Sequence, residues 1–420
     1  MVVSTRRSFR LRVAFCAVLV AVLASLITPP SAEALSRPAA KTIATGLSDI
    51  PCRYALLASK GTTAVVAYLD GETLKTRRSL NAGVTWESVR TISLNETEGF
   101  FGMACVAVVA TSTYFYLFAD TYAELQVDPA CEQNCETTVI NSLRFWRSSD
   151  GKSWSQMRPI ESSSIAEFRV SANATQIFLA VFEPNDSDCV EDCPAETGTI
   201  SIYETGTNNV VFGQATELVT DAGYYDDGTA AFLLGGGSIA TLTWFDGEGT
   251  SHMRSRAGVR NWRSAVTLGA NSEGVSASSG KSVFVGWNAY AASSFRWGIS
   301  ANSGSTWPRS KVKADSTYSF AQIRNVWPVG AKYGVALYRW NSRASITDIY
   351  LVTASSATKR WSMRSGEVCV GGVYVKSKVL VVARQATTSG GEWVWDQDLE
   401  DYEWIDGDTT YSLYSYTSAP

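Results

Sequence analysis

Histidine is almost absent from this sequence of 420 residues, since His252 is the only one. A zinc site with two histidine ligands is therefore excluded, and a Ser-His-Asp triad would have to be built around His252. His252 falls in a predicted outer strand, residues 251–255, where a half-exposed structural role is favoured over a catalytic one. Proline is also scarce, with 11 residues, and helical periodicity is almost absent, which argues against a helical fold.

Long apolar runs are lacking except for one, Val13 to Ile27, which is shorter than the roughly 20 residues of a membrane-spanning helix. Arginines precede this run and Ala32-Glu33-Ala34 follows it, as in a cleaved export signal. An uncleaved anchor and a twin-arginine signal at Arg6-Arg7 are the alternatives. We predict a signal peptide over residues 1–34. The mature chain, residues 35–420, is expected to be secreted without a membrane span, with the periplasm or cell surface as alternatives.

Positive charge is not in excess. The formal net charge of −4 becomes about −7 when residues 1–34, with four arginines and Glu33, are removed. Nucleic-acid binding normally requires a basic surface, so we expect no nucleic-acid partner.

What the chain has in abundance is short runs rich in Val, Tyr, Phe, Trp and Thr, separated by Gly, Asn, Asp and Ser, which predict an all-β fold. A Ser-x-Asn-x-Gly-x-Thr-Trp turn occurs at residues 79–86 and 300–307, and a shorter copy at residues 148–154. Asn or Asp binds the turn backbone, Gly takes a positive φ, and Trp packs between sheets. We therefore assign the following residues to folding: Ser79, Asn81, Gly83, Thr85, Trp86, Ser148, Asp150, Gly151, Trp154, Ser300, Asn302, Gly304, Thr306 and Trp307.

This turn resembles the Asp-box, or BNR repeat, of sialidase-like β-propellers. The resemblance implies four-stranded blades, with each box between the third and fourth strands on the face away from the ligand. Seven blades are favoured, and six, the number in sialidases, is the alternative. The last unit lacks a box, and a strand at Lys41–Thr45 is expected to complete it beside Tyr411–Tyr416 and close the ring. The expected inner strands begin near Cys52, Met103, Ala166, Thr229, Gly274, Phe320 and Val368.

The resemblance also makes glycoside hydrolysis the enzymatic activity to test. In sialidases three arginines clamp the substrate carboxylate, a Tyr paired with a Glu is the nucleophile, and an Asp is the general acid. Arg53 lies at a position comparable to that of the first arginine, although the family motif around it is not matched. Asp70, after the next strand, is a weak candidate for the acid, and Tyr338, on a late second strand, is a weak candidate for the nucleophile. The catalytic residues therefore stay unassigned, and the sequence favours a binding module over an enzyme.

Three acidic segments without Lys or Arg follow predicted second strands: residues 120–138, 183–197 and 392–408. In this fold such loops open on the ligand face, and a negative rim repels anionic sugars. We expect an extracellular protein or glycan ligand, with a cationic partner favoured, and no cofactor. A Ca²⁺-bridged contact and a merely solvated surface are the alternatives, and no EF-hand spacing is present. The predicted binding face is represented by Asp396, Asp398, Glu400 and Asp401.

Seven cysteines remain once Cys16 leaves with the signal peptide. Export favours disulfides, and an odd number leaves one thiol free or intermolecular. We expect two pairs to be oxidised, within each loop or across the two, with zinc binding as the alternative. One further bond is expected among three cysteines that open equivalent inner strands, with one thiol left buried. The loop cysteines are Cys131, Cys135, Cys189 and Cys193, and the inner-strand cysteines are Cys52, Cys105 and Cys369.

Overall fold

Strands of two to twelve residues, joined by turns, make up the described part of this computed structural model, and no helix occurs within it. Accordingly, no helix among the described residues is long and apolar enough to cross a membrane. Residues Arg37–Pro420 form one compact unit. The predicted signal peptide lies outside the described residues. The structure describes residues 36–47, 56–93, 100–126, 137–161, 167–185, 197–207, 210–223, 231–270, 272–289, 294–314, 320–341, 344–388, 392–396, 401–405 and 409–420.

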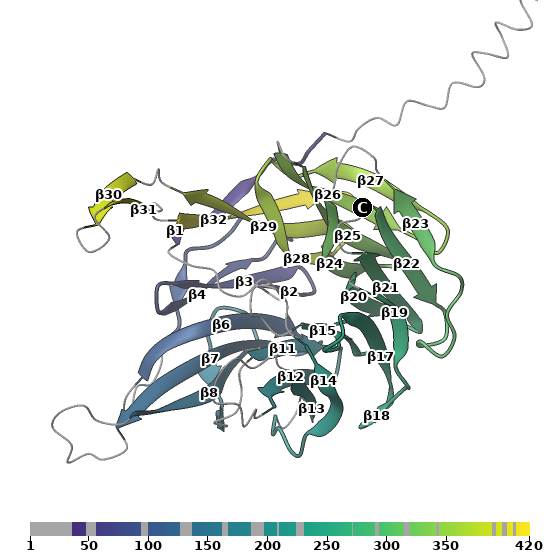
Figure 1. The fold of residues 1–420 in the computed structure, drawn as a ribbon, viewed down its shortest axis with the longest axis horizontal. Helices are drawn as coiled ribbons and strands as arrows, with labels where there is room; N and C mark the ends of the chain where they lie inside the picture. Colours follow the sequence, from purple (N-terminus) through teal and green to yellow (C-terminus); the bar gives the residue numbers. More distant parts are fainter. Residues whose placement is uncertain are drawn as a thin grey trace, which may run out of the picture. The chain divides into compact units, whose positions relative to one another are not determined.

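Seven antiparallel sheets follow one another around a ring, so the prediction of a seven-bladed β-propeller is confirmed (Figure 1). The described innermost strands of blades 2 to 7 begin within three residues of the predicted positions. In blades 2 and 4 two short strands share the outermost place. Blade 1 consists of β2 (Leu57–Lys60), β3 (Thr63–Asp70), β4 (Thr73–Ser79) and β5 (Arg90–Thr91). Blade 2 consists of β6 (Phe100–Ala110), β7 (Phe115–Gln126), β8 (Thr137–Ser148), β9 (Ser155–Gln156) and β10 (Ile160–Glu161). Blade 3 consists of β11 (Glu167–Ala172), β12 (Gln176–Pro184), β13 (Gly198–Gly206) and β14 (Thr216–Ala222).

The remaining blades follow the same plan, each running from the innermost strand outward. Blade 4 consists of β15 (Phe232–Gly235), β16 (Thr241–Phe245), β17 (Thr250–Gly258), β18 (Asn261–Trp262) and β19 (Val266–Ala270). Blade 5 consists of β20 (Ser272–Ser279), β21 (Ser282–Ala289), β22 (Ser294–Ser300) and β23 (Lys311–Ala314). Blade 6 consists of β24 (Phe320–Val329), β25 (Lys332–Asn341), β26 (Ala344–Val352) and β27 (Ala357–Ser362).

Blade 7 is built from both ends of the propeller. Its strands are β28 (Glu367–Val375), β29 (Lys378–Thr388), β32 (Thr409–Ser418) and β1 (Lys41–Leu47), in that order. β1 pairs antiparallel with β32, with Lys41 opposite Ser415 and Leu47 opposite Tyr411. The predicted closure of the ring by an N-terminal strand is therefore confirmed.

The hydrophobic core lies between blades. The second strand of each blade has neighbours on both faces, which is why β3 is buried at every position from Ala64 to Leu69. One apolar cluster joins Tyr116 and Phe118 of blade 2 to Phe168 and Leu179 of blade 3. Alternate residues of a strand point to opposite faces, so each blade contributes to two such layers.

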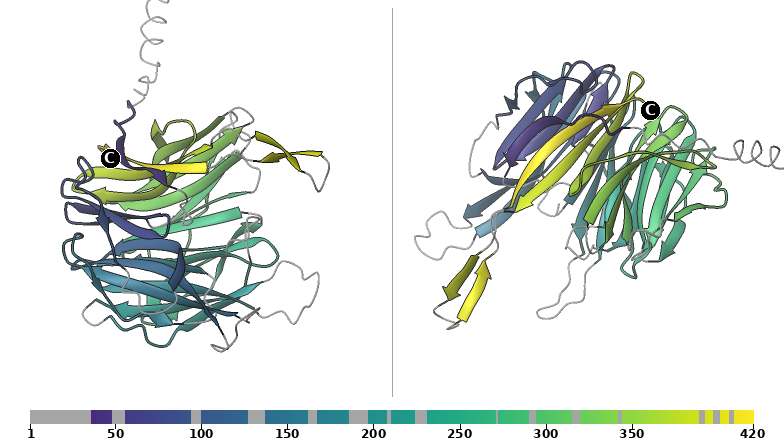
Figure 2. Two further views of the ribbon diagram at one scale, coloured as in Figure 1. Left: turned by 90° about the vertical axis from the view of Figure 1, so that its left-hand side faces the viewer. Right: turned by 90° about the horizontal axis from the view of Figure 1, so that it is seen from above.

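The sequence segment 392–408 is not the plain loop that was predicted. β30 (Glu392–Asp396) and β31 (Asp401–Ile405) pair as an antiparallel hairpin between β29 and β32. The hairpin forms a sheet of its own and stands away from the blades (Figures 1 and 2). Its acidic residues alternate with aromatic ones, and this period of two favours strands over a solvated loop.

The three repeated turns share one hydrogen-bond pattern. In the first, the Asn81 side chain accepts from the Thr85 amide at 2.9 Å, and the Ser79 hydroxyl accepts from the Gly83 amide at 2.8 Å. In the third turn the Asn302 side chain likewise accepts from the Thr306 amide at 2.9 Å. Asp150 accepts from two amides in the shorter turn. Burial alone would raise the pKa of Asp150, but these hydrogen bonds hold it at about 2.

The glycine of each turn meets the preceding blade. Gly83, Gly151 and Gly304 all have positive φ angles, between 73° and 81°. A Cβ on Gly83 would overlap the Leu380 side chain of blade 7, one on Gly151 would overlap Val65 of blade 1, and one on Gly304 would overlap Ser255 of blade 4. Glycine is therefore needed both for the backbone conformation and for the close approach of neighbouring blades.

We expect Gly83→Ala to destabilise the protein more than Gly61→Ala. Both glycines have positive φ, at 81° and 62°, but a Cβ on Gly61 would meet no atom within 4 Å. Backbone strain costs each variant about 1–2 kcal/mol. Overpacking against the buried Leu380 costs Gly83→Ala about 1–3 kcal/mol more. Urea denaturation measures the free energy of unfolding, and equal losses in the two variants would refute the inter-blade contact.

Candidate functional site at the strand 2–3 end of the propeller

The charged and aromatic side chains considered for a functional site lie at one end of the ring. The connections from second to third strands and from each blade to the next meet at this end, opposite the repeated turns. Asp70 closes β3, Asp120 lies at the middle of β7, and Tyr338 lies near the end of β25. The innermost strands begin here as well, so residues such as Glu167 lie at the same end.

Asp120, Glu167 and Arg169 form a charged cluster between blades 2 and 3. Nη2 of Arg169 donates to Oε2 of Glu167 at 2.7 Å. The Arg169 guanidinium also lies 4.9 Å from the centre of the Phe232 ring, on the first strand of blade 4. Asp120 is only 7% exposed, and its Oδ1 has no hydrogen-bond partner among the described residues.

The Asp120 carboxyl is the most perturbed acid in this cluster. Burial, together with repulsion from Glu167, raises the pKa of Asp120 to about 6. Removal from water disfavours the ionised form of a carboxyl. A carboxyl with a pKa near 6 is protonated in mildly acidic solution, where it is able to supply a proton or donate a hydrogen bond.

The prediction that Asp120 belongs to an exposed acidic loop is wrong. β7 continues to Gln126, and Asp120 follows Tyr116 and Phe118 on the face that packs against blade 3. Glu124 and Glu183, also assigned to loops, lie within β7 and β12. Strand length was underestimated because acidic residues were read as marking loops.

Blade 6 presents a second group of side chains at this end. The guanidinium of Arg324 lies 5.4 Å from the ring centre of Tyr338. Trp340, two residues further along β25, is 51% exposed and is paired in register with Phe320. Arg169 and Arg324 are the two arginines on the innermost strands that the structure describes.

The three residues suggested by the sialidase resemblance are not assembled into a site by the described residues. Arg53 lies outside them. Asp70 forms an ion pair with Lys75, and its side chain is 39% exposed. Tyr338 is partly buried beneath Arg324, in a different blade from Asp70. Their catalytic roles therefore stay predictions.

A Tyr–Glu pair does occur, at a place that sequence reasoning missed. The Tyr416 hydroxyl donates to Oε1 of Glu367 at 2.7 Å, and both residues are fully buried between blades 6 and 7. Burial and the adjacent Glu367 carboxylate raise the pKa of Tyr416 above its ordinary range. Being fully buried, this pair is a packing element and cannot reach a sugar. The two residues are 49 positions apart, so no local sequence motif predicts the pair.

His252 lies on β17, the third strand of blade 4, away from the innermost strand as predicted. Its Nε2 is 2.8 Å from Oδ2 of Asp246, and its ring stacks on Trp244 with 5.3 Å between ring centres. Asp246 also accepts from the amides of Glu248 and Thr250, so the pair holds the turn between β16 and β17.

The cysteines are only partly described. Cys369 is free and fully buried, and burial raises the pKa of its thiol to about 12. Cys105 is disulfide-bonded, to a partner that lies outside the described residues. Cys52 and the four loop cysteines Cys131, Cys135, Cys189 and Cys193 also lie outside, so the predicted pairings stay predictions.

The predicted binding face falls on the blade 7 hairpin. Asp396 ends β30 and Asp401 begins β31, and the two are paired in register. Asp398 and Glu400 lie outside the described residues. Within the part of the chain that the structure describes, no three His, Cys, Asp or Glu side chains gather as metal ligands would.

No family model and no curated protein matches this chain. Among solved structures, a prolyl endopeptidase is matched over 99% of this chain and 56% of its own, with 11% identity and a TM-score of 0.46. This chain thus spans little more than half of that protein's length. An ulvan lyase of polysaccharide lyase family 25 is matched over 83% of this chain and 92% of its own, with 9% identity and a TM-score of 0.49. Trypanosoma rangeli sialidase is matched over 78% of this chain and 55% of its own, with 12% identity and a TM-score of 0.41. At these values the similarities assign no function to any residue.

We expect Asp120→Asn to stabilise the protein at neutral and alkaline pH. The folded-state pKa of Asp120, about 6, lies above the unfolded value of about 3.9, so protonated Asp120 favours the folded state. This contribution is complete below about pH 4 and is lost as the pH rises through 6. A rise of this size in the pKa of Asp120 corresponds to about 3 kcal/mol in the free energy of unfolding. The variant should therefore gain up to that amount at pH 8 and little at pH 4.

Chemical denaturation at pH 4, 6 and 8 tests this expectation. Asp221→Asn, which changes an exposed acid on β14, is the matched control and should show no such pH dependence. A gain for Asp120→Asn that is the same at all three pH values would show that Asp120 is not held protonated by the fold.

Proposed function

We propose that this propeller is an exported binding module of sialidase-like type, which takes a cationic partner at the end of the ring where the β30–β31 hairpin emerges. The observation that carries the proposal is the hairpin itself. It is an acidic two-stranded element that projects from blade 7 and pairs with no other described strand. Isolated hairpins are at best marginally stable in water, so a bound partner would give this one a further contact.

The register of the hairpin separates two kinds of residue. Trp393 is opposite Trp404 and Trp395 is opposite Tyr402. Because alternate positions of a strand belong to opposite faces, these four aromatic positions share one face. The acidic positions of both strands share the other face: Glu392, Asp396, Asp401 and Glu403.

Both faces suit a Lys- or Arg-rich partner. Aromatic faces attract ammonium and guanidinium groups by about 0.5–2 kcal/mol each. The segment 392–408 carries eight acidic residues and no basic one, and segments 128–138 and 186–197 add further acids without a base. A rim of this sign attracts cations and disfavours anionic sugars. A standard interface needs about 800 Å² per partner, which is more than a single short hairpin offers, so the neighbouring acidic segments would contribute.

The wider classification rests on the repeated turns. Their sequence and their hydrogen bonds from Ser79, Asn81 and their counterparts fit the Asp-box of sialidase-like propellers. Export rests on residues 1–34, whose pattern is that of a cleaved signal peptide.

Neutralising Asp396, Asp398, Glu400 and Asp401 together, to Asn or Gln, should weaken binding of a decalysine peptide at least tenfold. The control is a variant with the same change in net charge, made at four exposed acids elsewhere: Glu72, Glu217, Asp221 and Glu248. Binding by the native protein should also fall as salt rises from about 0.05 to about 0.5 M, because exposed charges are screened. Fluorescence anisotropy of the labelled peptide measures both effects. Equal loss in the two variants, or no loss in either, would refute the hairpin as the binding face.

The second candidate function is an exo-acting glycosidase of sialidase type. Asp120 favours it, because a carboxyl with a pKa of about 6 suits a general acid and lies beside Glu167 and Arg169. We expect no hydrolysis of a fluorogenic sialoside by protein that binds decalysine. Hydrolysis that is abolished by Arg53→Ala and by Asp120→Asn, but kept by the four-acid hairpin variant, would establish the enzyme and overturn the binding-module proposal.

A further inference from the structure

The charge of the mature chain is divided unevenly among the blades. Residues 231–366, which make up blades 4 to 6, contain sixteen Lys or Arg residues and five Asp or Glu residues. The rest of residues 35–420 contains sixteen basic and thirty-four acidic residues. Blades 4 to 6 therefore have a formal net charge of +11, and the rest of the mature chain has one of −18. One molecule thus offers both a cationic and an anionic surface.

The cationic part includes an exposed outer edge on blade 5. β23 is the last strand of that sheet and lies on the outside of the ring (Figure 1). Arg309, Lys311 and Lys313 are exposed, and so is Arg296 on the adjoining β22. Among the described residues, none of these four side chains has an ion-pair or hydrogen-bond partner. These four residues and Val312 make up the blade 5 edge.

Positive charge occupies both faces of the sheet at this edge. Lys311 and Lys313 are two positions apart along β23, so they share one face. Arg296 is opposite Val312 in register, so these two residues share the other face. Val312 is 52% exposed and offers an apolar contact between the charges.

Lysines on an edge strand commonly protect an open sheet from pairing with other strands. That protection is selective, because a basic strand is repelled by the lysines whereas an acidic strand is attracted. β23 has no strand beyond it in the part of the sheet that the structure describes. Its outer N–H and C=O groups are therefore open to the addition of a strand, and its charges favour an acidic one.

The hairpin of blade 7 is an acidic element of this form. β30 and β31 pair with each other and with no other described strand, so each has a free edge. Their acidic positions share one face, as described above. Blade 6 lies between blade 5 and blade 7 in the ring, so a contact between the hairpin and the blade 5 edge joins different copies of the chain.

We propose that the cationic partner of the hairpin is a second copy of this chain, which receives the hairpin along its blade 5 edge. This inference rests on the function proposed above and names its partner. A hairpin on one edge strand buries less than a standard interface of about 1,600 Å², so the contact is weak and reversible. The two surfaces differ, so copies join head to tail into rings or chains.

Sedimentation velocity of the mature protein tests the association from roughly 5 to 500 μM, the range in which a small interface forms. At about 0.05 M salt the weight-average mass should rise with concentration toward twice the monomer mass or beyond. At about 0.5 M salt it should stay at the monomer mass, because the attraction is screened. A monomer at every concentration in low salt, with decalysine still bound, overturns this inference alone. Failure to bind decalysine overturns the proposed function as well.

Charge reversal locates the contact. Arg309→Glu, Lys311→Glu and Lys313→Glu together should abolish association but keep decalysine binding, since the hairpin is unchanged. The matched control reverses three exposed lysines on blades 6 and 7: Lys332, Lys376 and Lys378. This control should associate like the native protein. Equal loss of association in both variants, or no loss in the blade 5 variant, refutes the blade 5 edge as the receiving surface.

A charge swap separates a specific contact from a general loss of stability. Changing the hairpin acids Glu392, Asp396, Asp401 and Glu403 to Lys should also give a monomer, since hairpin and edge are then both positive. Mixed with the blade 5 variant, this protein should associate again, because each hairpin meets an edge of opposite charge. A mixture that stays monomeric, from two variants with native Tm, overturns the inference.

Discussion

The pairing of β1 with β32 is the interaction on which the rest of this propeller depends. Each blade buries one face against the blade before it and one against the blade after it, so an open ring would leave two apolar faces exposed. The N-terminal strand completes blade 7 and brings it against blade 1. The Trp86 indole donates to Ser415 at 2.8 Å, and Arg77 of blade 1 donates to the carbonyl of Ile43 in β1 at 2.6 Å. Closure is therefore secured by the backbone ladder and by side chains of the neighbouring blade.

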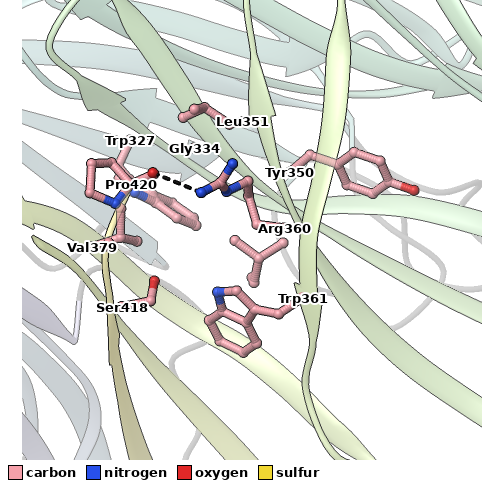
Figure 3. Close-up of a pocket in the computed structure, with 11 residues that line it drawn as sticks. Trp327, Gly334, Tyr350, Leu351, Arg360, Trp361, Val379, Ser418 and Pro420 are labelled. Carbon is pink, nitrogen blue, oxygen red and sulfur yellow. Dashed lines mark hydrogen bonds between the residues drawn. The ribbon is translucent and has the colours of Figure 1, made fainter. Parts of the chain in front are cut away.

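The same closure positions the elements to which a function is assigned. The hairpin leaves blade 7 between β29 and β32, whose paired ends are Thr388 and Thr409. A small pocket between blades 6 and 7 lies at the other end of the same blade, where Ser418 and Pro420 line it (Figure 3). A single blade thus carries the proposed partner-binding element at one end and the last residues of the sequence at the other.

Much of the fold could be predicted because its signals are local. The Ser79, Ser148 and Ser300 turns share a short local pattern, and their residue types follow from the hydrogen bonds and the positive φ that the turn needs. The boxless last unit with a spare N-terminal strand was sufficient to predict closure. The hairpin was missed, although aromatic and acidic residues alternate along Glu392–Asp396, because the density of acids was taken to mean a loop.

The side-chain clusters could not be predicted because they join distant parts of the chain. Asp120 is perturbed by Glu167 across a blade boundary, and Tyr416 meets Glu367 across 49 residues. The pocket combines Trp327 with Pro420, from the beginning of one blade and the end of another. Which residues of two blades come together depends on the register of every strand between them, and no local pattern encodes it.

The most direct test of this account is native-state hydrogen exchange of β1 and β32 in graded denaturant. If their pairing holds the whole ring closed, their amides should exchange only through global unfolding, with the same free energy as the buried strands β3 and β12. Exchange of β1 and β32 through a local opening of lower free energy, while β3 and β12 stay protected, would contradict the dependence of the ring on this closure.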